Sequence, residues 1–238
     1  MTKTKYPGKL IVFEGIDGSG KATQAKFLKK FLKKKDIEVE KIDFPQYETK
    51  SAGMVENYLD GKYGSAKEVG AYRASIFFAC DRYDASFKMK KWLKEGKVVI
   101  ADRYLASNIA HQGGKIEDRK EREEYFKWLY NLEYNIFEIP RPDLTFILKT
   151  SVELAKKMAA RVEDEEKRKK KTSFLKGKKQ DIHESDLNHL ANALKAYEHV
   201  AQIFPEEFRL IECLNNEGKW LKPKMINNKI IKEINKIL

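Results

Sequence analysis

Three glycines and a lysine follow a short apolar run near the start of the chain. The run Leu10–Phe13 has the composition of a buried strand, and Gly15, Gly18, Gly20 and Lys21 come soon after it. Glycines at this spacing, between a strand and a helix, let backbone N–H groups surround an anion while the lysine reaches the β- and γ-phosphates of a nucleotide. The loop is therefore predicted to hold the phosphates of ATP. Nine residues are predicted to form this site: Gly15, Ile16, Asp17, Gly18, Ser19, Gly20, Lys21, Ala22 and Thr23.

The residue after the lysine departs from the usual pattern. Most loops of this type have Ser or Thr there, and its hydroxyl binds Mg²⁺. This chain has Ala22 instead. Thr23 supplies a hydroxyl one residue later, but successive residues on a helix point about 100° apart. We therefore expect Mg²⁺ to depend more on water, carboxylates and substrate phosphates.

A second polar group ends another apolar run. Asp102, Arg103 and Tyr104 follow Val98–Ala101, and open α/β folds bind ligands at the carboxyl edge of the sheet. A carboxylate there can hold Mg²⁺ through water, and a guanidinium has the planar fork that binds phosphate. We expect Arg103 to neutralise charge between a donor and an acceptor phosphate. The same tripeptide recurs at Asp81–Tyr83 within a helical pattern, where a helix-surface ion pair is the alternative interpretation.

These loops require a framework of strands and helices. Short apolar runs alternate with helical patterns, which predicts an α/β fold with a mostly parallel sheet covered by helices on both faces. The runs are Leu10–Phe13, Val39–Ile42, Val98–Ala101, Leu144–Leu148 and Phe208–Ile211. A helix is predicted to follow the glycine loop over Lys21–Lys34, and a second long amphipathic helix is predicted over Leu187–Phe204.

Residues 1–238 are interpreted as one domain, because no linker or repeat interrupts them. The segment Glu163–Lys179 differs from the rest in having few apolar residues and dense charge. A charged loop of this length is typical of a mobile active-site lid, which we place at about residues 162–180. A disordered insertion is the alternative.

Composition limits the classes of function. The 238 residues are 42% hydrophobic and carry a net charge of +12, which suits either a nucleic-acid binder or an enzyme whose substrates carry phosphates. Because many of the lysines fall on predicted exposed helix faces without interleaved aromatic residues, nucleic acid is not expected as a partner. Cys80 and Cys213 have no metal-ligand spacing, and no apolar run is long enough to span a membrane. A soluble, cytoplasmic protein is expected.

Four segments together resemble the thymidylate kinases of the nucleoside monophosphate kinase superfamily. They are Phe13–Lys21, Phe44–Pro45, Phe77–Arg82 and Asp102–Asn108. The resemblance implies a three-layer P-loop kinase fold with a five-stranded parallel sheet, helices on both faces and a mobile lid. It also implies a homodimer packed through helices between Ala66 and Leu93.

The resemblance implies several contacts with an acceptor nucleotide. In that family a phenylalanine stacks on thymine and an arginine four residues later reaches a base carbonyl, positions that Phe78 and Arg82 match. Residues four apart share one helix face, whereas Phe77 points away and is expected in the core. Asn108 matches a position that bonds the base edge, with a helix cap as the alternative. Gln112 is placed in the same pocket.

Other positions are expected around the sugar and phosphate. By the same resemblance Asp17 contacts the deoxyribose or its metal and water shell, Arg103 binds the acceptor phosphate, and Tyr47 lies near it. Gln46 replaces an arginine that many relatives have, which puts one phosphate contact in doubt. His111 stands where relatives often have an aromatic residue that screens the sugar 2′ position.

The glycine loop contains no arginine, so the resemblance implies that a transition-state cation comes from the lid. Arg161 is the favoured candidate, with Arg168 as the alternative. Glu184 matches an acid that approaches the sugar and its metal, and it joins Asp102 as a predicted Mg²⁺ ligand. The catalytic residues implied are Asp17, Lys21, Arg103 and Arg161.

The activity implied is transfer of the γ-phosphoryl group of ATP to dTMP, with Mg²⁺ as cofactor, giving dTDP and ADP for dTTP synthesis. Another pyrimidine nucleoside monophosphate kinase is the nearest alternative. A P-loop ATPase stimulated by nucleic acid is a third possibility from a different class.

Overall fold

The computed structural model describes residues 6–161 and 187–238. Five parallel strands form one sheet in the order β2-β3-β1-β4-β5, with β1 at its centre. The strands are β1 (Lys9–Glu14), β2 (Val39–Asp43), β3 (Val98–Asp102), β4 (Leu144–Lys149) and β5 (Phe208–Glu212). Each contains or overlaps one of the five predicted apolar runs, so the predicted α/β fold with a parallel sheet is confirmed.

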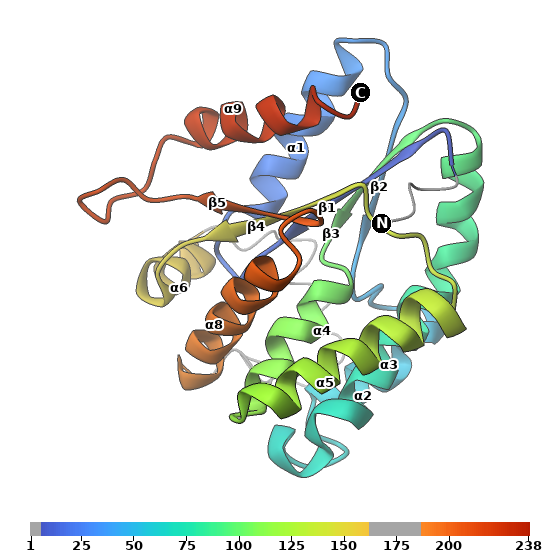
Figure 1. Ribbon diagram of the computed structural model, residues 1–238, viewed down its shortest axis with the longest axis vertical. Coiled ribbons are helices and arrows are strands. Elements are labelled where there is room, and N and C mark those ends of the chain that lie inside the picture. The colour runs from blue at the N-terminus through green and yellow to red at the C-terminus, as the bar shows by residue number, and fades with distance from the viewer. Residues whose placement is uncertain (1–5, 162–186) are drawn as a thin grey trace.

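Helices cover both faces of the sheet, with α1 and α9 on one face and α3, α4, α5 and α8 on the other (Figure 1). The helices are α1 (Lys21–Lys33), α2 (Gly53–Leu59), α3 (Ala66–Lys94), α4 (Leu105–His111), α5 (Arg119–Tyr130), α6 (Val152–Arg161), α8 (Leu187–Ile203) and α9 (Pro223–Ile234). Short 3₁₀ turns occupy Lys50–Ala52 and Gly113–Lys115, and a π-helical turn occupies Asn131–Ile136.

The three central strands β1, β3 and β4 are mostly apolar because both of their faces are buried, whereas the edge strands β2 and β5 carry exposed charged residues. In β1, Leu10 and Val12 pack into the core beneath α3, α4, α5 and α8, while Ile11 and Phe13 pack into the core beneath α1 and α9. The ring of Phe13 stacks on Phe146 of β4 with centroids 5.7 Å apart. This double burial fixes the register of β1, whose carboxyl end leads into the glycine loop.

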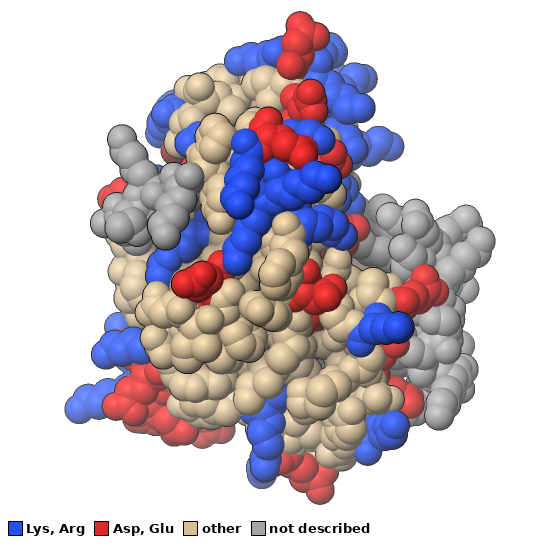
Figure 2. Space-filling view, turned by 90° about the vertical axis from the view of Figure 1, so that its right-hand side faces the viewer, with Lys and Arg blue, Asp and Glu red and all other residues tan. Residues whose placement is uncertain are grey.

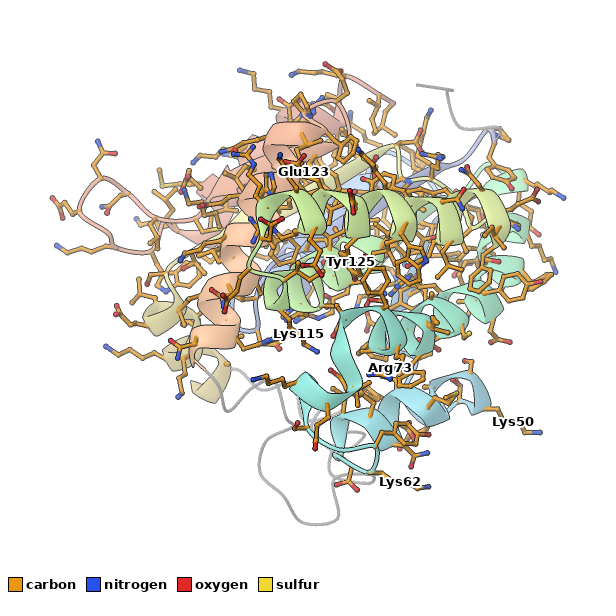
Figure 3. The ribbon with its side chains drawn as sticks, turned by 60° about the horizontal axis from the view of Figure 1, so that its bottom comes forward. Lys50, Lys62, Arg73, Lys115, Glu123 and Tyr125 are labelled. Carbon is orange, nitrogen blue, oxygen red and sulfur yellow. The ribbon has the colours of Figure 1, made fainter. Side chains whose placement is uncertain are left out.

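Helix α3 supplies much of the predicted acceptor site, and its start is shaped by a kink. Ser65 and Glu68 form a capping box at the first turn, and Gly70 interrupts the helix with φ 75°. The Arg73 side chain donates hydrogen bonds to the carbonyl oxygens of Glu68 and Val69, the two residues just before the kink (Figure 3). Beyond the kink the helix runs uninterrupted to Lys94.

Some of the predicted features cannot be placed. The lid at about 162–180, together with Arg168 and Glu184, lies outside the described residues. The backbone of Arg161 ends α6, but its side chain also lies outside the described part. No helix in the described ranges is long and apolar enough to cross a membrane.

Candidate active site

The glycine loop joins β1 to α1 at the carboxyl edge of the sheet. Gly18 has φ 82°, and a Cβ there would overlap the carbonyl oxygen of Ala155 in α6, so no larger residue fits. Gly20, with φ 95°, precedes α1 and turns the first N–H groups of that helix toward the loop. The Lys21 ammonium donates to the carbonyl oxygens of Gly15 at 2.9 Å and Ile16 at 3.1 Å. The loop thus presents a lysine and the positive end of a helix to an anion.

Arg103 lies beside this loop, directly after β3. Its backbone has φ 69°, and its N–H donates to the carbonyl oxygen of Phe13 on the neighbouring strand. Nη2 lies 2.7 Å from Asp17 Oδ1, and Nη1 donates to Gly15 O at 3.3 Å and Ser107 Oγ at 3.2 Å. The guanidinium is therefore held in place by contacts to both the glycine loop and α4.

Two histidines extend this network from Arg103 to α8. Arg103 Nη1 lies 3.2 Å from His111 Nε2, and because a guanidinium only donates, Nε2 must accept. The remaining ring proton is then on Nδ1, which donates to His189 Nε2 at 3.3 Å. Burial lowers the pKa of His111 well below its usual value, and the neighbouring Arg103 lowers it further. His111 is therefore neutral at pH 7, with a defined tautomer.

A buried carboxylate ties the same region together. Oε1 of Glu14, the last residue of β1, accepts from the backbone N–H groups of Tyr104 at 2.7 Å and Ser107 at 3.0 Å. Oε2 accepts from the hydroxyls of Ser107 at 2.6 Å and Tyr197 at 2.8 Å. Burial raises the pKa of the Glu14 carboxyl, while these hydrogen bonds and the Arg103 charge act in the opposite direction. Glu14 thereby caps α4 and joins it to α8.

A cavity of about 380 Å³ opens next to Arg103. It brings together all eight residues predicted for the acceptor site: Asp17, Tyr47, Phe78, Arg82, Arg103, Asn108, His111 and Gln112. They come from the glycine loop, the segment after β2, α3 and the β3–α4 region, which are far apart in the sequence. Gathering these residues in one place is a result of the fold; their individual roles stay predictions.

The two neighbouring phenylalanines of α3 are placed differently. Phe78 lines the cavity and meets Tyr58 edge-on, with centroids 6.1 Å apart. Phe77 packs against Tyr58 and Tyr63 and is absent from the cavity wall. Of these two phenylalanines, Phe78 is thus the one available to stack on a ligand in the cavity.

Arg82 is buried, so it does not form a helix-surface ion pair as the alternative interpretation supposed. Its Nε and Nη2 donate to the two carboxylate oxygens of Glu133 at 2.6 and 2.7 Å. The π-helical turn Asn131–Ile136 carries Glu133 into the interior. No described residue accepts a hydrogen bond from Nη1, and Arg82 lines the cavity, so Nη1 offers donors there.

Asn108 offers the cavity a hydrogen-bond acceptor, whereas Arg82 offers donors. Its side-chain NH₂ donates to the carbonyl oxygen of Ser75 at 3.1 Å. Because a main-chain carbonyl can only accept, the amide is oriented with Oδ1 on its other side. Among the described residues none donates to Oδ1, and Asn108 lines the cavity. Asn108 lies within α4 rather than capping it.

The segment after β2 is anchored to α3 by a buried acid. Asp81 accepts from the backbone N–H of Gln46 at 2.9 Å and from Ser51 Oγ at 2.8 Å, so Asp81 too is no surface residue. Lys88 of α3 is exposed, and it also lines the cavity and donates to Gln46 Oε1 at 3.2 Å. A cation is thus present where the expected arginine is replaced by Gln46.

The described residues offer a modest donor set for Mg²⁺. They contain no cluster of three or more His, Cys, Asp or Glu side chains. Asp102 is buried at the carboxyl end of β3, opposite Phe13 in the register of the central strand. One or two carboxylates beside substrate phosphates and water fit the preferences of Mg²⁺. Glu184, the other predicted ligand, lies outside the described part of the chain.

Several residues of the site were missed from the sequence. Glu14 directly precedes the glycine loop and Ser107 lies one helical turn after Arg103, so their positions gave a weak signal. Glu133 and Tyr197 gave none, because their partners are more than 50 residues away.

The contacts of Glu14 predict contrasting effects of two substitutions. Glu14→Gln keeps an oxygen for the two backbone donors, and the hydroxyls of Ser107 and Tyr197 can turn to accept from the new NH₂ group. It should lower the free energy of unfolding by about 1 kcal/mol. Glu14→Ala leaves two buried N–H groups unpaired and a cavity, and should cost about 3–5 kcal/mol. Urea unfolding measures both. Equal losses would show that the charge matters, not the hydrogen bonds.

Comparison with known proteins agrees with the resemblance. A family model described as thymidylate kinase matches residues 13–203. The thymidylate kinase of Plasmodium falciparum is 32% identical over 148 residues, covering 62% of this chain and 64% of that protein. The putative thymidylate kinase 251L of Invertebrate iridescent virus 6 is 36% identical, covering 59% and 60%. These alignments span less than two thirds of either relative. A probable thymidylate kinase of Methanosarcina acetivorans is 33% identical over 171 residues, covering 71% and 78%.

Solved structures share the fold. The thymidylate kinase of Candida albicans matches with a TM-score of 0.69 and 22% identity, covering 96% of this chain and 92% of that one. The enzyme of Ehrlichia chaffeensis matches with a TM-score of 0.63, covering 95% and 98%. Because the family model extends from the end of β1 to the end of α8, the chain belongs to the thymidylate kinase family.

Proposed function

We propose that this protein transfers the γ-phosphoryl group of ATP to dTMP, giving dTDP and ADP. The observation that carries the proposal is the single cavity that joins the glycine loop to all eight predicted acceptor residues. Membership of the thymidylate kinase family supports it.

The polar wall of the cavity suits one edge of thymine. Arg82 offers donors and Asn108 offers an acceptor, while a 4-carbonyl beside an N3–H presents the complementary acceptor and donor. Cytosine has the reverse polarity at both atoms, so a cytosine base would place donor against donor and acceptor against acceptor. Phe78 provides a ring on which the base can stack.

Phosphoryl transfer in this site depends on positioning and charge. A phosphate monoester has its second pKa near 6, so the acceptor is an anion at pH 7 and requires no strong base. Lys21 and Arg103 both approach Asp17 Oδ1, at 3.9 and 2.7 Å, and are proposed to supply two cations where the donor and acceptor phosphates meet. We assign Arg161 at the end of α6 as the further cation.

The proposal includes Mg²⁺, which substrate phosphates and water would hold together with a protein carboxylate. Of the two predicted carboxylate ligands, Asp102 is the one that lies within the described residues. When bound, it supplies charge neutralisation on the phosphate oxygens. Asp17, which accepts from Arg103, is proposed to contact the sugar or its water shell. His111, neutral and beside Arg103, is proposed to screen the sugar 2′ position.

A homodimer is also proposed, on the basis of an exposed apolar stripe along α3. Tyr72, Ile76, Tyr83 and Phe87 are exposed, Phe87 by 60%, and their spacing places them on one side of the helix. On the side of the molecule shown in Figure 2, uncharged surface fills the middle and Lys and Arg gather above it. A continuous apolar strip on a long helix is typical of a subunit interface.

The two cysteines are unpaired in the structure. Free thiols are usual in reducing compartments, and on this ground, together with the use of free nucleotides as substrates, we propose a cytoplasmic location.

The proposed activity predicts an order of acceptors. In steady-state assays with dTMP, dUMP, UMP, CMP, GMP and AMP, kcat/KM should be highest for dTMP, and the dTMP to dUMP ratio reports whether the cavity accommodates the 5-methyl group. A preference for UMP or CMP would assign the protein to another pyrimidine kinase. ATP hydrolysis stimulated by DNA or RNA, falling steeply with salt, would favour the nucleic-acid alternative.

Arg103→Ala is expected to reduce kcat by about 100-fold or more, since it removes a fixed cation from the reacting phosphates. Binding of ATP should persist, because Lys21 and the loop backbone are unchanged. A fluorescent ATP analogue measures binding in parallel with the kinetic assay. Near-normal turnover would contradict the role assigned to Arg103.

The proposed dimer predicts that Phe87→Glu dissociates it, because a buried carboxylate without a partner is costly. Sedimentation velocity should show a dimer for the unmodified protein and a monomer for the variant. Met225→Glu, on α9 across the sheet and 49% exposed, serves as the control and should leave the mass unchanged. A monomer for the unmodified protein at micromolar concentration would refute the proposal.

A further inference from the structure

A lysine that the sequence did not single out lies beside the polar wall of the cavity, which Arg82 and Asn108 form. Lys115 ends the short turn after α4, and its ammonium points toward the start of α3 (Figure 3). It donates to Gln112 Oε1 at 2.6 Å, to the hydroxyl of Tyr58 at 2.7 Å and to the carbonyl oxygen of Ala66 at 3.2 Å. Three oxygens therefore surround a cation that has three hydrogens to give.

This contact, together with a longer one of 3.4 Å from the Tyr58 hydroxyl to the same oxygen, decides which way the Gln112 amide faces. An ammonium has no acceptor, so the amide atom that touches it must be oxygen. The NH₂ group then takes the other branch of the amide. Gln112 is 1% exposed and lines the cavity, and no described residue accepts a hydrogen bond from its Nε2. The amide donor is therefore available to a ligand in the cavity.

The position of this donor along the wall follows from how α3 and α4 pair. Asn108 bonds Ser75 of α3, whereas Lys115, four residues past the end of α4, bonds Ala66, so the two segments run in opposite directions. Gln112 thus lies near the start of α3, Asn108 beside its middle, and Arg82 beyond that. Along the wall the order is donor, acceptor, donor.

We propose that Lys115 is a positioning residue that fixes the Gln112 amide so that the wall reads a 2,4-dioxopyrimidine. Such a base presents acceptor, donor and acceptor at its 4-carbonyl, N3–H and 2-carbonyl, which matches all three groups. Guanine matches the first two but presents a 2-amino donor to Gln112. The inference rests on the proposed function, because it assigns the third contact of the same acceptor site.

The orientation does not depend on one protonation state of the lysine. Burial lowers the pKa of Lys115 to about 7, so both forms are present near neutral pH. A neutral amine keeps two hydrogens, which serve Ala66 O and Gln112 Oε1, while the Tyr58 hydroxyl turns to donate to the nitrogen. Gln112 keeps the same direction in both forms.

The test compares Lys115→Met, which keeps the length of the stem but removes the donors, with Lys62→Met. Lys62 is exposed in the turn after α2 and serves as the matched control (Figure 3). For dTMP, Lys115→Met should raise KM about tenfold with a smaller change in kcat, and Lys62→Met should leave both unchanged. Melting temperatures of both variants report any loss of folding.

Sulfur-substituted acceptors locate the contact on the base. Sulfur is a weaker hydrogen-bond acceptor than oxygen. The proposed hydrogen bond from Gln112 to the 2-position is therefore already weak in 2-thio-dTMP. Lys115→Met should change its KM by no more than about twofold, while 4-thio-dTMP should show the full effect. An equal effect on both analogues would overturn the proposal. The unmodified protein gives a check independent of folding, since equal KM values for dTMP and 2-thio-dTMP would also overturn it.

A double-mutant cycle tests whether Lys115 acts through Gln112. In a Gln112→Ala background, Lys115→Met should raise KM by no more than about twofold, because the oriented amide is already gone. Additive losses would show that Lys115 acts elsewhere and would refute the inference. If the unmodified protein preferred another pyrimidine monophosphate, the proposed function would fail. The same double-mutant cycle, measured with that nucleotide, would still show whether Lys115 acts through Gln112.

Discussion

The site depends on the buried carboxylate of Glu14. This one side chain accepts hydrogen bonds from the first turn of α4 and from the hydroxyl of Tyr197 in α8. It sits at the end of the central strand, immediately before the glycine loop. A carboxylate buried with full hydrogen bonding is tolerated where an unpaired one is not. The phosphate loop, the β3–α4 turn and α8 are consequently fixed to one another at a single point.

The unusual backbone of Arg103 follows from this constraint. Its φ of 69° is uncommon for a residue with a side chain, and it is held between its own N–H bond to Phe13 and the capped start of α4. With the backbone set, the guanidinium reaches Asp17 and His111 at once. The pairing with Asp17 couples the cation assigned to the acceptor phosphate to the loop assigned to the donor phosphate.

The sequence predicted those elements whose pattern lies within a short stretch of the chain. Apolar runs located the strands, and the glycine spacing located the phosphate loop, because each pattern lies within a few consecutive residues. The burial of Asp81 could not be predicted, since on a helix the same residue types occur on exposed and buried faces alike. Glu133 and Lys115 escaped notice because their roles arise from pairings, with Arg82 across 51 positions and with Tyr58 across 57, that only the folded chain creates.

Recognition in the cavity follows a common physical rule. Amides present a donor and an acceptor on nearly identical branches, so an asparagine or glutamine alone cannot fix the polarity of a wall. Here each ambiguous or mobile group is set by a neighbour that can bond in one sense only. The Ser75 carbonyl accepts from Asn108, the Glu133 carboxylate accepts from Arg82, and the Lys115 nitrogen donates to Gln112. In the proposed recognition, specificity is therefore encoded as much in residues behind the wall as in those that face the ligand.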